Sequence, residues 1–246
     1  MTTRADRYQS ARRDPAWAVL EGFHPLKHAL RFGARVVDAA TPDASAVLAL
    51  AAALAPDLLP VLPGLLEQVA ADEFARIASP PTAVVALAVR PPAGEAAALG
   101  HPGPAPVVLL DRPNHLGNLG AVVRVAAAAG AAGVVATGDR DPWDPAALRG
   151  SAGLHFALPV ARLTGPLPVG RPLVAVTPGG TPLWEASLPD GAILAFGGER
   201  RGLDPVLVEA ADARIGIPME PGVSSLNLAT AAAVVLFEAQ RRSAGH

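Results

Sequence analysis

The stretch Ile193-Leu-Ala-Phe-Gly-Gly-Glu-Arg-Arg-Gly202 joins an apolar run directly to a polar, glycine-rich turn. The run Ile193–Gly197 shows no alternation of polar and apolar residues, which is typical of a strand covered on both faces of a parallel sheet. A similar run, Leu173–Thr177, precedes it. Open α/β sheets bind their ligands beyond the carboxyl ends of the strands. The stretch therefore predicts an α/β protein with a functional loop at residues 197–202.

Further strands and helices alternate around this stretch. The pattern predicts strands at Val107–Asp111, Gly133–Thr137, His155–Val160 and Arg214–Ile217, and helices at Leu119–Ala129, Pro145–Arg149, Asp204–Ala211 and Leu226–Arg241. Parallel strands need crossover connections, which helices usually supply. Residues 107–246 are therefore expected to form a mostly parallel sheet with flanking helices.

Proline and glycine are dense in residues 91–106, which predicts a linker between two domains. Residues 14–90 are expected to form a small α/β domain. Its predicted strands are Trp17–Glu21, Arg35–Asp38, Leu58–Leu62 and Ala83–Val89, and its predicted helices are Pro25–Phe32, Ser45–Ala55 and Leu65–Ala78. Residues 1–13 are polar and rich in arginine, so we expect a disordered basic arm there.

The composition indicates a folded protein, because 51% of the 246 residues are hydrophobic and only 17% are charged. The net charge of −2 argues against a uniformly basic surface. Residues 1–37 nevertheless carry a local excess of basic side chains, Lys27 and Arg31 among them, which could contact phosphates. The absence of cysteine excludes disulfides. Without a signal peptide or a run long enough to span a bilayer, we expect a cytoplasmic protein.

Asn118 and Arg124 form the first of three polar clusters in the second half of the chain. Arg124 lies in a predicted helix with almost no other polar side chain. A buried guanidinium is costly unless it is paired, so Arg124 is expected to contact a carboxylate or a phosphate, unless its side chain extends to the helix edge. Asn118 suits the helix N-cap, which would leave main-chain N–H groups free for an anion.

The second and third clusters also follow predicted strands. In the second, Glu199 is the carboxylate best placed to pair with Arg124 or Asn118. The third runs from Ile217 through Ser224-Ser225-Leu226-Asn227 and opens the last helix. Ser225 could be a helix cap, and Asn227 is unfavourable within a helix unless it caps it.

Together, the three clusters resemble the three motifs of the SpoU/TrmH-type branch of the SPOUT RNA methyltransferases, in the same order, over residues 107–242. The resemblance implies a trefoil-knotted domain that binds S-adenosylmethionine and methylates a ribose 2′-hydroxyl of RNA. It places Asn118, Arg124, Glu199, Ser225 and Asn227 in the reaction centre. It places Gly198, Ile217 and Leu226 at the cofactor.

The resemblance extends to two further segments. Arg149-Gly-Ser-Ala-Gly153 matches a family stretch, so Arg149 and Ser151 are candidate RNA contacts, although a plain helix-end turn explains them equally. The N-terminal half resembles the small ribosomal-protein-like RNA-binding domain of many such enzymes, with Lys27 and Arg31 as candidate contacts. A second RNA-binding domain favours a large, folded RNA, and therefore rRNA over tRNA, as the substrate. Family members usually form homodimers through the knotted domain, and we expect the same here.

Other readings have less support. His24 and His28 are one helical turn apart, but no third ligand accompanies them, so we expect no metal site. A dinucleotide-binding enzyme would need a Gly-x-Gly-x-x-Gly stretch, which is missing. The main alternative is a knotted RNA-binding protein without methyltransferase activity, and the presence of all five reaction-centre residues argues against it.

Overall fold

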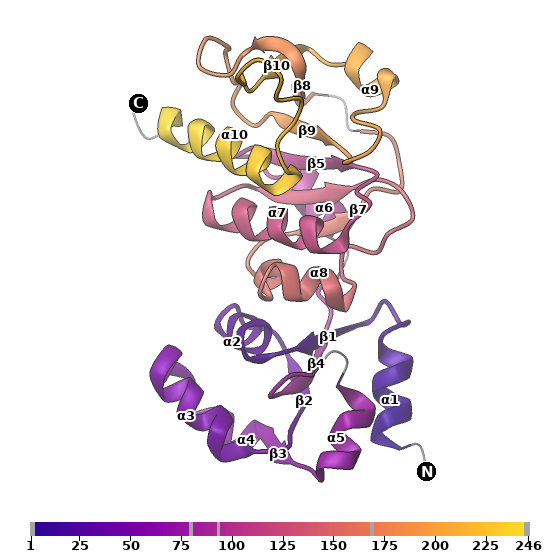
Figure 1. Ribbon diagram of the computed structural model, residues 1–246, viewed down its shortest axis with the longest axis vertical. Coiled ribbons are helices and arrows are strands. Elements are labelled where there is room, and N and C mark those ends of the chain that lie inside the picture. Colours follow the sequence, from indigo (N-terminus) through magenta and orange to yellow (C-terminus); the bar gives the residue numbers. More distant parts are fainter. Residues whose placement is uncertain (1–2, 79–80, 93, 168–169, 244–246) are drawn as a thin grey trace. The chain divides into compact units, whose positions relative to one another are not determined.

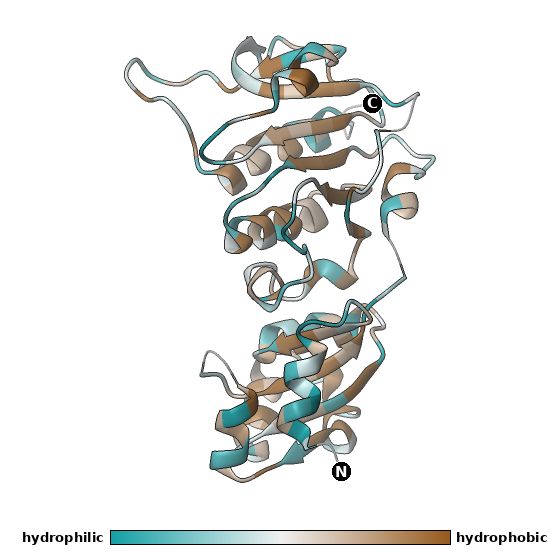
Figure 2. Ribbon diagram, turned by 90° about the vertical axis from the view of Figure 1, so that its right-hand side faces the viewer, coloured by the Kyte–Doolittle hydropathy of each residue, from teal (hydrophilic) through white to brown (hydrophobic). Residues whose placement is uncertain are grey.

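The computed structural model describes residues 3–78, 81–92, 94–167 and 170–243. The chain folds into two compact units (Figure 1). Unit 1 is formed by the chain up to Pro92 together with Trp143–Ala157, and unit 2 is formed by the rest. In both units the strands are mostly apolar, as Figure 2 shows.

Unit 2 is built on a six-stranded sheet in which every neighbouring pair is parallel, in the order β10-β8-β9-β5-β6-β7. The strands are β5 (Val107–Asp111), β6 (Gly133–Ala136), β7 (Val160–Arg162), β8 (Leu173–Pro182), β9 (Ile193–Gly197) and β10 (Ala213–Gly216). β5 and β9 pair at the centre and are buried along almost their whole length. The predicted mostly parallel sheet is thus confirmed. The trefoil knot stays a prediction.

The helices of unit 2 are α6 (Gly94–Leu99), α7 (Leu116–Ala128), α9 (Pro205–Glu209) and α10 (Leu228–Ser243). α7 and α10 pack against each other (Figure 1). α6 corrects the prediction of a linker over residues 91–106, of which residue 93 lies outside the described residues. Its Glu-Ala-Ala-Ala-Leu sequence favours a helix. Its buried Ala98 packs on β6, where a Cβ at Gly133 would come within 2.5 Å of the Ala98 Cβ.

Unit 1 contains a four-stranded sheet in the order β1-β4-β2-β3. Its strands are β1 (Trp17–Glu21), β2 (Val36–Thr41), β3 (Leu66–Gln68) and β4 (Val85–Val89), and only the β2–β3 pair is parallel. Its helices are α1 (Arg4–Ala11), α2 (Phe23–Arg31), α3 (Ala44–Leu54), α4 (Leu62–Leu65), α5 (Ala71–Ile77) and α8 (Pro145–Gly150), with short 3₁₀ turns η1 (Pro56–Leu58) and η2 (Leu154–Phe156).

Three predicted elements are wrong, two within unit 1 and one that spans the boundary between the units in the sequence. The predicted strand Leu58–Leu62 is a turn between η1 and α4, because Pro56, Pro60 and Pro63 cannot donate to a sheet ladder. The predicted helix Leu65–Ala78 is divided into β3 and α5. The predicted strand His155–Val160 begins instead as the 3₁₀ turn η2, and the extended segment starts only at Val160 in unit 2.

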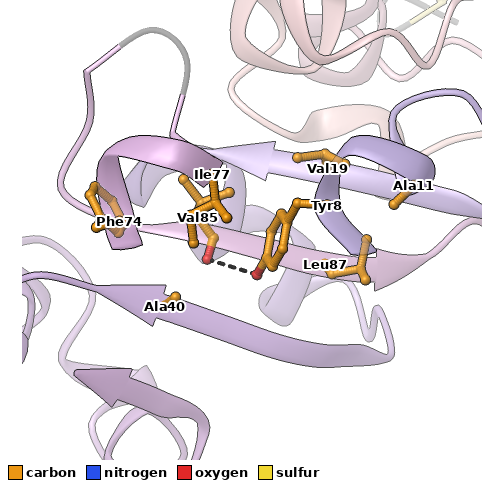
Figure 3. Close-up of a cluster of buried hydrophobic side chains, with 8 residues drawn as sticks. All are labelled: Tyr8, Ala11, Val19, Ala40, Phe74, Ile77, Val85 and Leu87. Atoms are coloured by element: carbon orange, nitrogen blue, oxygen red, sulfur yellow. Dashed lines mark hydrogen bonds between the residues drawn. The ribbon is translucent and has the colours of Figure 1, made fainter. Parts of the chain in front are cut away.

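The N-terminal segment is a packed helix, which corrects the predicted disordered arm over residues 1–13, although residues 1 and 2 lie outside the described part. Thr3 and Asp6 form a capping box at the start of α1. Tyr8 is fully buried, and its hydroxyl donates to the Val85 carbonyl at 3.3 Å (Figure 3). The Tyr8 ring packs with Val19, Ile77 and Leu87, so α1 completes the core of unit 1.

Across the described ranges, no helix combines the length and the apolar character needed to cross a membrane.

Candidate active site

A cavity of about 550 Å³ opens at the carboxyl edge of the unit 2 sheet. The middle of β8, the end of β9 with the loop after it, the segment after β10 and the start of α10 line the cavity. The lining includes Thr177, Phe196, Gly198, Leu203, Ile217, Met219, Ser225, Leu226 and Asn227. A slightly larger cavity of about 600 Å³ lies by the amino ends of β5 and β9, between Pro104 and Arg242. None of the predicted site residues lines that larger cavity, so the candidate site is the one at the carboxyl edge.

The glycine loop, residues 198–203, forms one wall of the site. A Cβ at Gly197 would overlap the main chain of Gly202, and a Cβ at Gly198 would lie 2.6 Å from the Arg112 carbonyl oxygen. Gly198 and Gly202 form an isolated antiparallel bridge, in which the Gly202 N–H donates to the Gly198 carbonyl at 3.0 Å. The loop thus turns back on itself through contacts that only glycine permits.

Asn118 links the three polar clusters, and its partner in the second cluster is Glu199. Oε1 of Glu199 accepts a hydrogen bond from Nδ2 of Asn118 at 2.7 Å, and its Oε2 accepts one from the main-chain N–H of Asn114 at 3.1 Å. Asn118 in turn accepts a hydrogen bond from Nδ2 of Asn227 at 3.2 Å. Asn118, Glu199 and Asn227 therefore form one connected network from three distant parts of the chain.

The network keeps Glu199 ionised. Partial burial alone would raise the pKa of Glu199. The hydrogen bonds from Asn118 and from main-chain N–H groups, together with the neighbouring His115, outweigh burial, and the pKa of Glu199 is lowered. At neutral pH this side chain therefore accepts hydrogen bonds and donates none.

Arg124 lies outside this network. It is exposed on α7 and makes no hydrogen bond or ion pair with any residue in the described part of the chain, which agrees with the alternative of a side chain that extends to the helix edge and not with a buried, paired guanidinium. Six residues separate it from Asn118, which is a rotation of about 240° around the helix axis. The two side chains therefore leave α7 in different directions, and Glu199 pairs with Asn118 instead.

The helix caps also differ from the predictions. α7 begins at Leu116, so Asn118 lies inside the first turn and is free to bond Glu199. Asn227 does cap α10, because its Oδ1 accepts the Ala229 N–H at 2.9 Å, and its amide remains available to Asn118. Ser225 is exposed and lines the cavity.

All three residues expected at the cofactor, Gly198, Ile217 and Leu226, line the cavity. Sequence reasoning missed Phe196, Leu203 and Met219, which complete its apolar lining. Met219 lies within the third cluster, two residues after Ile217, so the sequence could have indicated that it also lines the cavity. Nothing in the sequence indicated that the main-chain N–H of Asn114 bonds Glu199.

The candidate RNA contacts lie in unit 1, and most are engaged within it. Arg149 forms an ion pair with Glu21, and Arg31 pairs with Asp57 at 2.5 Å. Ser151 corrects the prediction, because it is fully buried. Its hydroxyl lies 2.7 Å from Nδ1 of His155 and accepts the Gly153 N–H, so it stabilises the turn after α8. Lys27 is half-buried on α2.

Within the ranges that the structure covers, no three histidine or carboxylate side chains gather closely enough to hold a metal ion.

The sequence is similar to those of known RNA methyltransferases. A family model described as the SpoU rRNA Methylase family matches residues 105–237. An uncharacterized tRNA/rRNA methyltransferase of Synechocystis is 38% identical over 144 residues, which are 55% of this chain and 53% of the relative. The 23S rRNA (uridine(2479)-2′-O)-methyltransferase of Streptomyces viridochromogenes is 35% identical over 55% of this chain and 52% of its own length. The chain thus spans about half the length of these two relatives.

Similarity to a solved structure extends over nearly the whole chain. The SpoU methyltransferase AviRb of Streptomyces viridochromogenes, solved in complex with AdoMet, superposes with a TM-score of 0.81. The superposition covers 99% of this chain and 100% of AviRb at 26% sequence identity.

Proposed function

Because the chain belongs to the SpoU rRNA methylase family, we propose that it transfers a methyl group from S-adenosylmethionine to a ribose 2′-hydroxyl of a structured RNA. The observation that carries the proposal is the Glu199–Asn118–Asn227 network beside the cavity at the carboxyl edge of the sheet. The alternative, a knotted RNA-binding protein without methyltransferase activity, has no need of such a network.

The cavity fits a cofactor of this size and chemistry. Its volume of about 550 Å³ falls within the range of small-molecule sites, and its lining is mainly apolar side chains and glycine main chain. Ile217, Leu226 and Met219 would contact the apolar parts, and the main chain at Gly198 and Gly202 would supply polar contacts. AviRb, which was solved with AdoMet, shares this fold. Bound here, S-adenosylmethionine would supply an electrophilic methyl group.

The side chains around the cavity would prepare the ribose for attack. The 2′-hydroxyl must approach in line with the methyl group and lose its proton as it attacks. Ionised Glu199 holds Asn118, and Asn118 holds Asn227, so the three side chains present fixed hydrogen-bonding groups. Ser225, exposed at the cavity rim, is placed to contact the ribose.

Arg124 would bind the RNA backbone near the reacting ribose. A guanidinium is a poor general base, but it binds phosphates well and stabilises a developing alkoxide. Its exposure and lack of a partner within the described residues leave it available for this role.

Ribosomal RNA is the favoured substrate. The Streptomyces viridochromogenes relative and a Streptomyces laurentii relative, 33% identical over 65% of this chain, are both named 23S rRNA 2′-O-methyltransferases. Unit 1 would supply a second RNA-binding surface, for which the exposed Arg31 and the half-buried Lys27 on α2 are candidates. RNA processing of this kind takes place in the cytoplasm, where we place the protein.

We also propose a homodimer formed through unit 2. Val234 and Phe237 on α10 are 39% and 47% exposed and lie three residues apart on the helix, so they offer neighbouring apolar side chains to a second copy of the chain. Light scattering should report a dimer mass for the wild type and a monomer for Phe237→Glu. A monomeric wild type would contradict this part of the proposal.

The decisive experiment measures transfer of labelled methyl from S-adenosylmethionine to unmodified rRNA and tRNA. We expect label in rRNA, resistant to alkali at one dinucleotide because the 2′-hydroxyl is blocked. Arg124→Ala should lose it, and Arg76→Ala, a surface arginine of unit 1 with a 65% exposed side chain, should keep it. Cofactor binding without transfer to either RNA would favour the alternative, and absence of cofactor binding would overturn the proposal.

A further inference from the structure

Asp111 is a buried carboxylate at the carboxyl end of β5, and none of the roles proposed above involves it. Its side chain is 4% exposed. Oδ1 accepts a hydrogen bond from the Thr137 hydroxyl at 2.7 Å, and Oδ2 accepts one from the main-chain N–H of Asp204 at 2.9 Å. The Arg112 guanidinium donates to the same Oδ2 at 3.0 Å. A buried carboxylate holds its hydrogen-bond donors in place. If a donor moved away, the buried charge would be less well compensated and the folded state would be destabilised.

The contact to Asp204 fixes the far end of the glycine loop. The near end is held by sheet pairing, since Gly197 on β9 lies opposite Asp111 on β5. The far end reaches Asp204, whose side chain caps α9 by accepting the Val206 N–H at 2.9 Å. Both ends of the loop that carries Glu199 are therefore attached to one residue, by its main chain at one end and its side chain at the other.

Arg112 strengthens this attachment. It adopts a left-handed conformation with φ of 47°, which is uncommon for a residue other than glycine. In this conformation its carbonyl faces Gly198, and its guanidinium pairs with Asp204 at 3.1 Å as well as with Asp111. Its N–H donates to the Thr137 hydroxyl at 2.9 Å. The end of β5 thus supports the loop at both of its ends.

We propose that Asp111 is a positioning residue, which sets the place of Glu199 by anchoring the glycine loop to β5. Asp111 does not line the cavity, so it acts through the loop and not on a ligand. The catalytic part of this inference rests on the proposed methyl transfer, in which Glu199 organises the reaction centre.

The first test is a double-mutant cycle on kcat for methyl transfer. Asp111→Ala removes all three contacts, and Asp111→Asn keeps the volume and part of the hydrogen bonding in case the alanine variant does not fold. We expect kcat to fall by about 10-fold for Asp111→Asn and further for Asp111→Ala. In a Glu199→Gln background the same changes should cost less than about 3-fold, because the side chain that Asp111 positions is already disabled. Additive losses in the two backgrounds would overturn the positioning role.

The second test is independent of turnover and measures hydrogen exchange of peptides covering residues 198–204. Asp111→Asn should accelerate exchange there by about 10-fold or more and leave β7 and β10, which Asp111 does not contact, unchanged. Asp212→Asn is the matched control, since Asp212 also accepts a main-chain N–H, that of Leu173 at 2.7 Å, in the same unit. Unchanged exchange in the loop would overturn the anchoring. A wild type that neither binds S-adenosylmethionine nor methylates RNA would instead overturn the proposed function, and the exchange result would still decide the anchoring.

Discussion

Among single residues, Glu199 connects the glycine loop both to α7 and to the segment before α7, because its two carboxylate oxygens bond different residues. One oxygen holds Asn118 on α7, and the other holds the main chain at Asn114 before α7. An amide in its place would present an N–H group to one of these two donors. The charge of Glu199 therefore matters as much as its shape.

Glu199→Gln should lower kcat for methyl transfer by about 100-fold, because misplacing groups by about 1 Å in a reaction centre costs this much. The dissociation constant for S-adenosylmethionine should change less than about 3-fold, since glutamine has nearly the same size as the Glu199 side chain and the apolar lining of the cavity is unchanged. Steady-state kinetics at saturating RNA and cofactor measure kcat. Calorimetric titration measures the dissociation constant of the cofactor, so the two effects are separated. Glu209→Gln, on the exposed end of α9, is the control and should resemble the wild type. A large loss of cofactor affinity with unchanged kcat would contradict the assigned role.

The lowered pKa of Glu199 has a consequence for stability as the pH falls. A carboxyl group with a lowered pKa in the folded state contributes stability above its unfolded pKa of about 4.3, and this contribution is lost as the pH falls through the folded value. Wild type and Glu199→Gln should therefore differ most in Tm between pH 5 and 7, with the wild type higher. The difference should shrink below about pH 4. Thermal unfolding across this range measures it, and a gap that widens toward acid would refute the sign of the shift.

Sequence reasoning found the residues of the network but not all of their contacts. Asn118, Glu199 and Asn227 were identifiable because polar side chains at strand ends are conspicuous in an apolar chain. Whether Arg124 is buried or extends to the helix edge stayed open, because an alanine-rich helix gives little indication of which side faces the core. Ser151 was misjudged for a related reason, since a serine in a glycine-rich turn looks exposed unless its buried partner His155 is known.

At the scale of elements, the glycine loop depends on close approach of two main-chain segments. Gly197→Ala should abolish S-adenosylmethionine binding, because the added Cβ would overlap the main chain of Gly202 and force the loop open. Gly117→Ala is the matched control, as a Cβ there meets nothing within 4 Å, and alanine favours the helix α7. Calorimetric titration checks binding, and circular dichroism checks that the variants fold. Wild-type affinity in a folded Gly197→Ala would contradict the close-approach argument.

The bounds of several elements could be read from the sequence. β1, β5 and β9 begin and end at the predicted residues, because each is a short apolar run bounded by turn residues or by a change in polarity. The segments around Leu58–Leu62 and residues 91–106 could not be read this way. In both segments, frequent proline hides the spacing of apolar residues that would predict a helix or a strand. Tertiary packing, such as that of Ala98 against Gly133, decides where a short helix forms.

At the scale of the whole molecule, unit 1 is assembled from two separate stretches of the chain. Residues Trp143–Ala157 belong to it although unit 2 precedes and follows them in sequence. Gly153 packs so closely that a Cβ would lie 2.5 Å from the Pro25 carbonyl oxygen, and His28 lies 2.6 Å from the Ala152 carbonyl through its Nδ1. Such long-range pairing could not be inferred from periodicity, which only reports local structure.

Glu21 joins the two stretches electrostatically. Its side chain is 1% exposed, and it pairs with Arg12 after α1 at 2.7 Å and with Arg149 on α8. Removing one partner of a buried charge leaves the charge poorly compensated, which is more costly than losing a surface pair. Arg149 therefore has a structural role that competes with the RNA contact expected from the sequence.

Arg149→Ala separates these two roles. If Arg149 compensates Glu21, the variant should lose about 1–3 kcal/mol of unfolding free energy in urea, while the dissociation constant for RNA changes less than about 3-fold. Arg162→Ala, an exposed arginine on β7, is the control and should change unfolding by less than about 0.5 kcal/mol. In a Glu21→Gln background, Arg149→Ala should cost much less, because the buried charge that it serves is gone. The opposite pattern, unchanged unfolding with RNA binding weakened 10-fold or more, would assign Arg149 to the RNA instead, because a phosphate contact stabilises the complex and not the free protein.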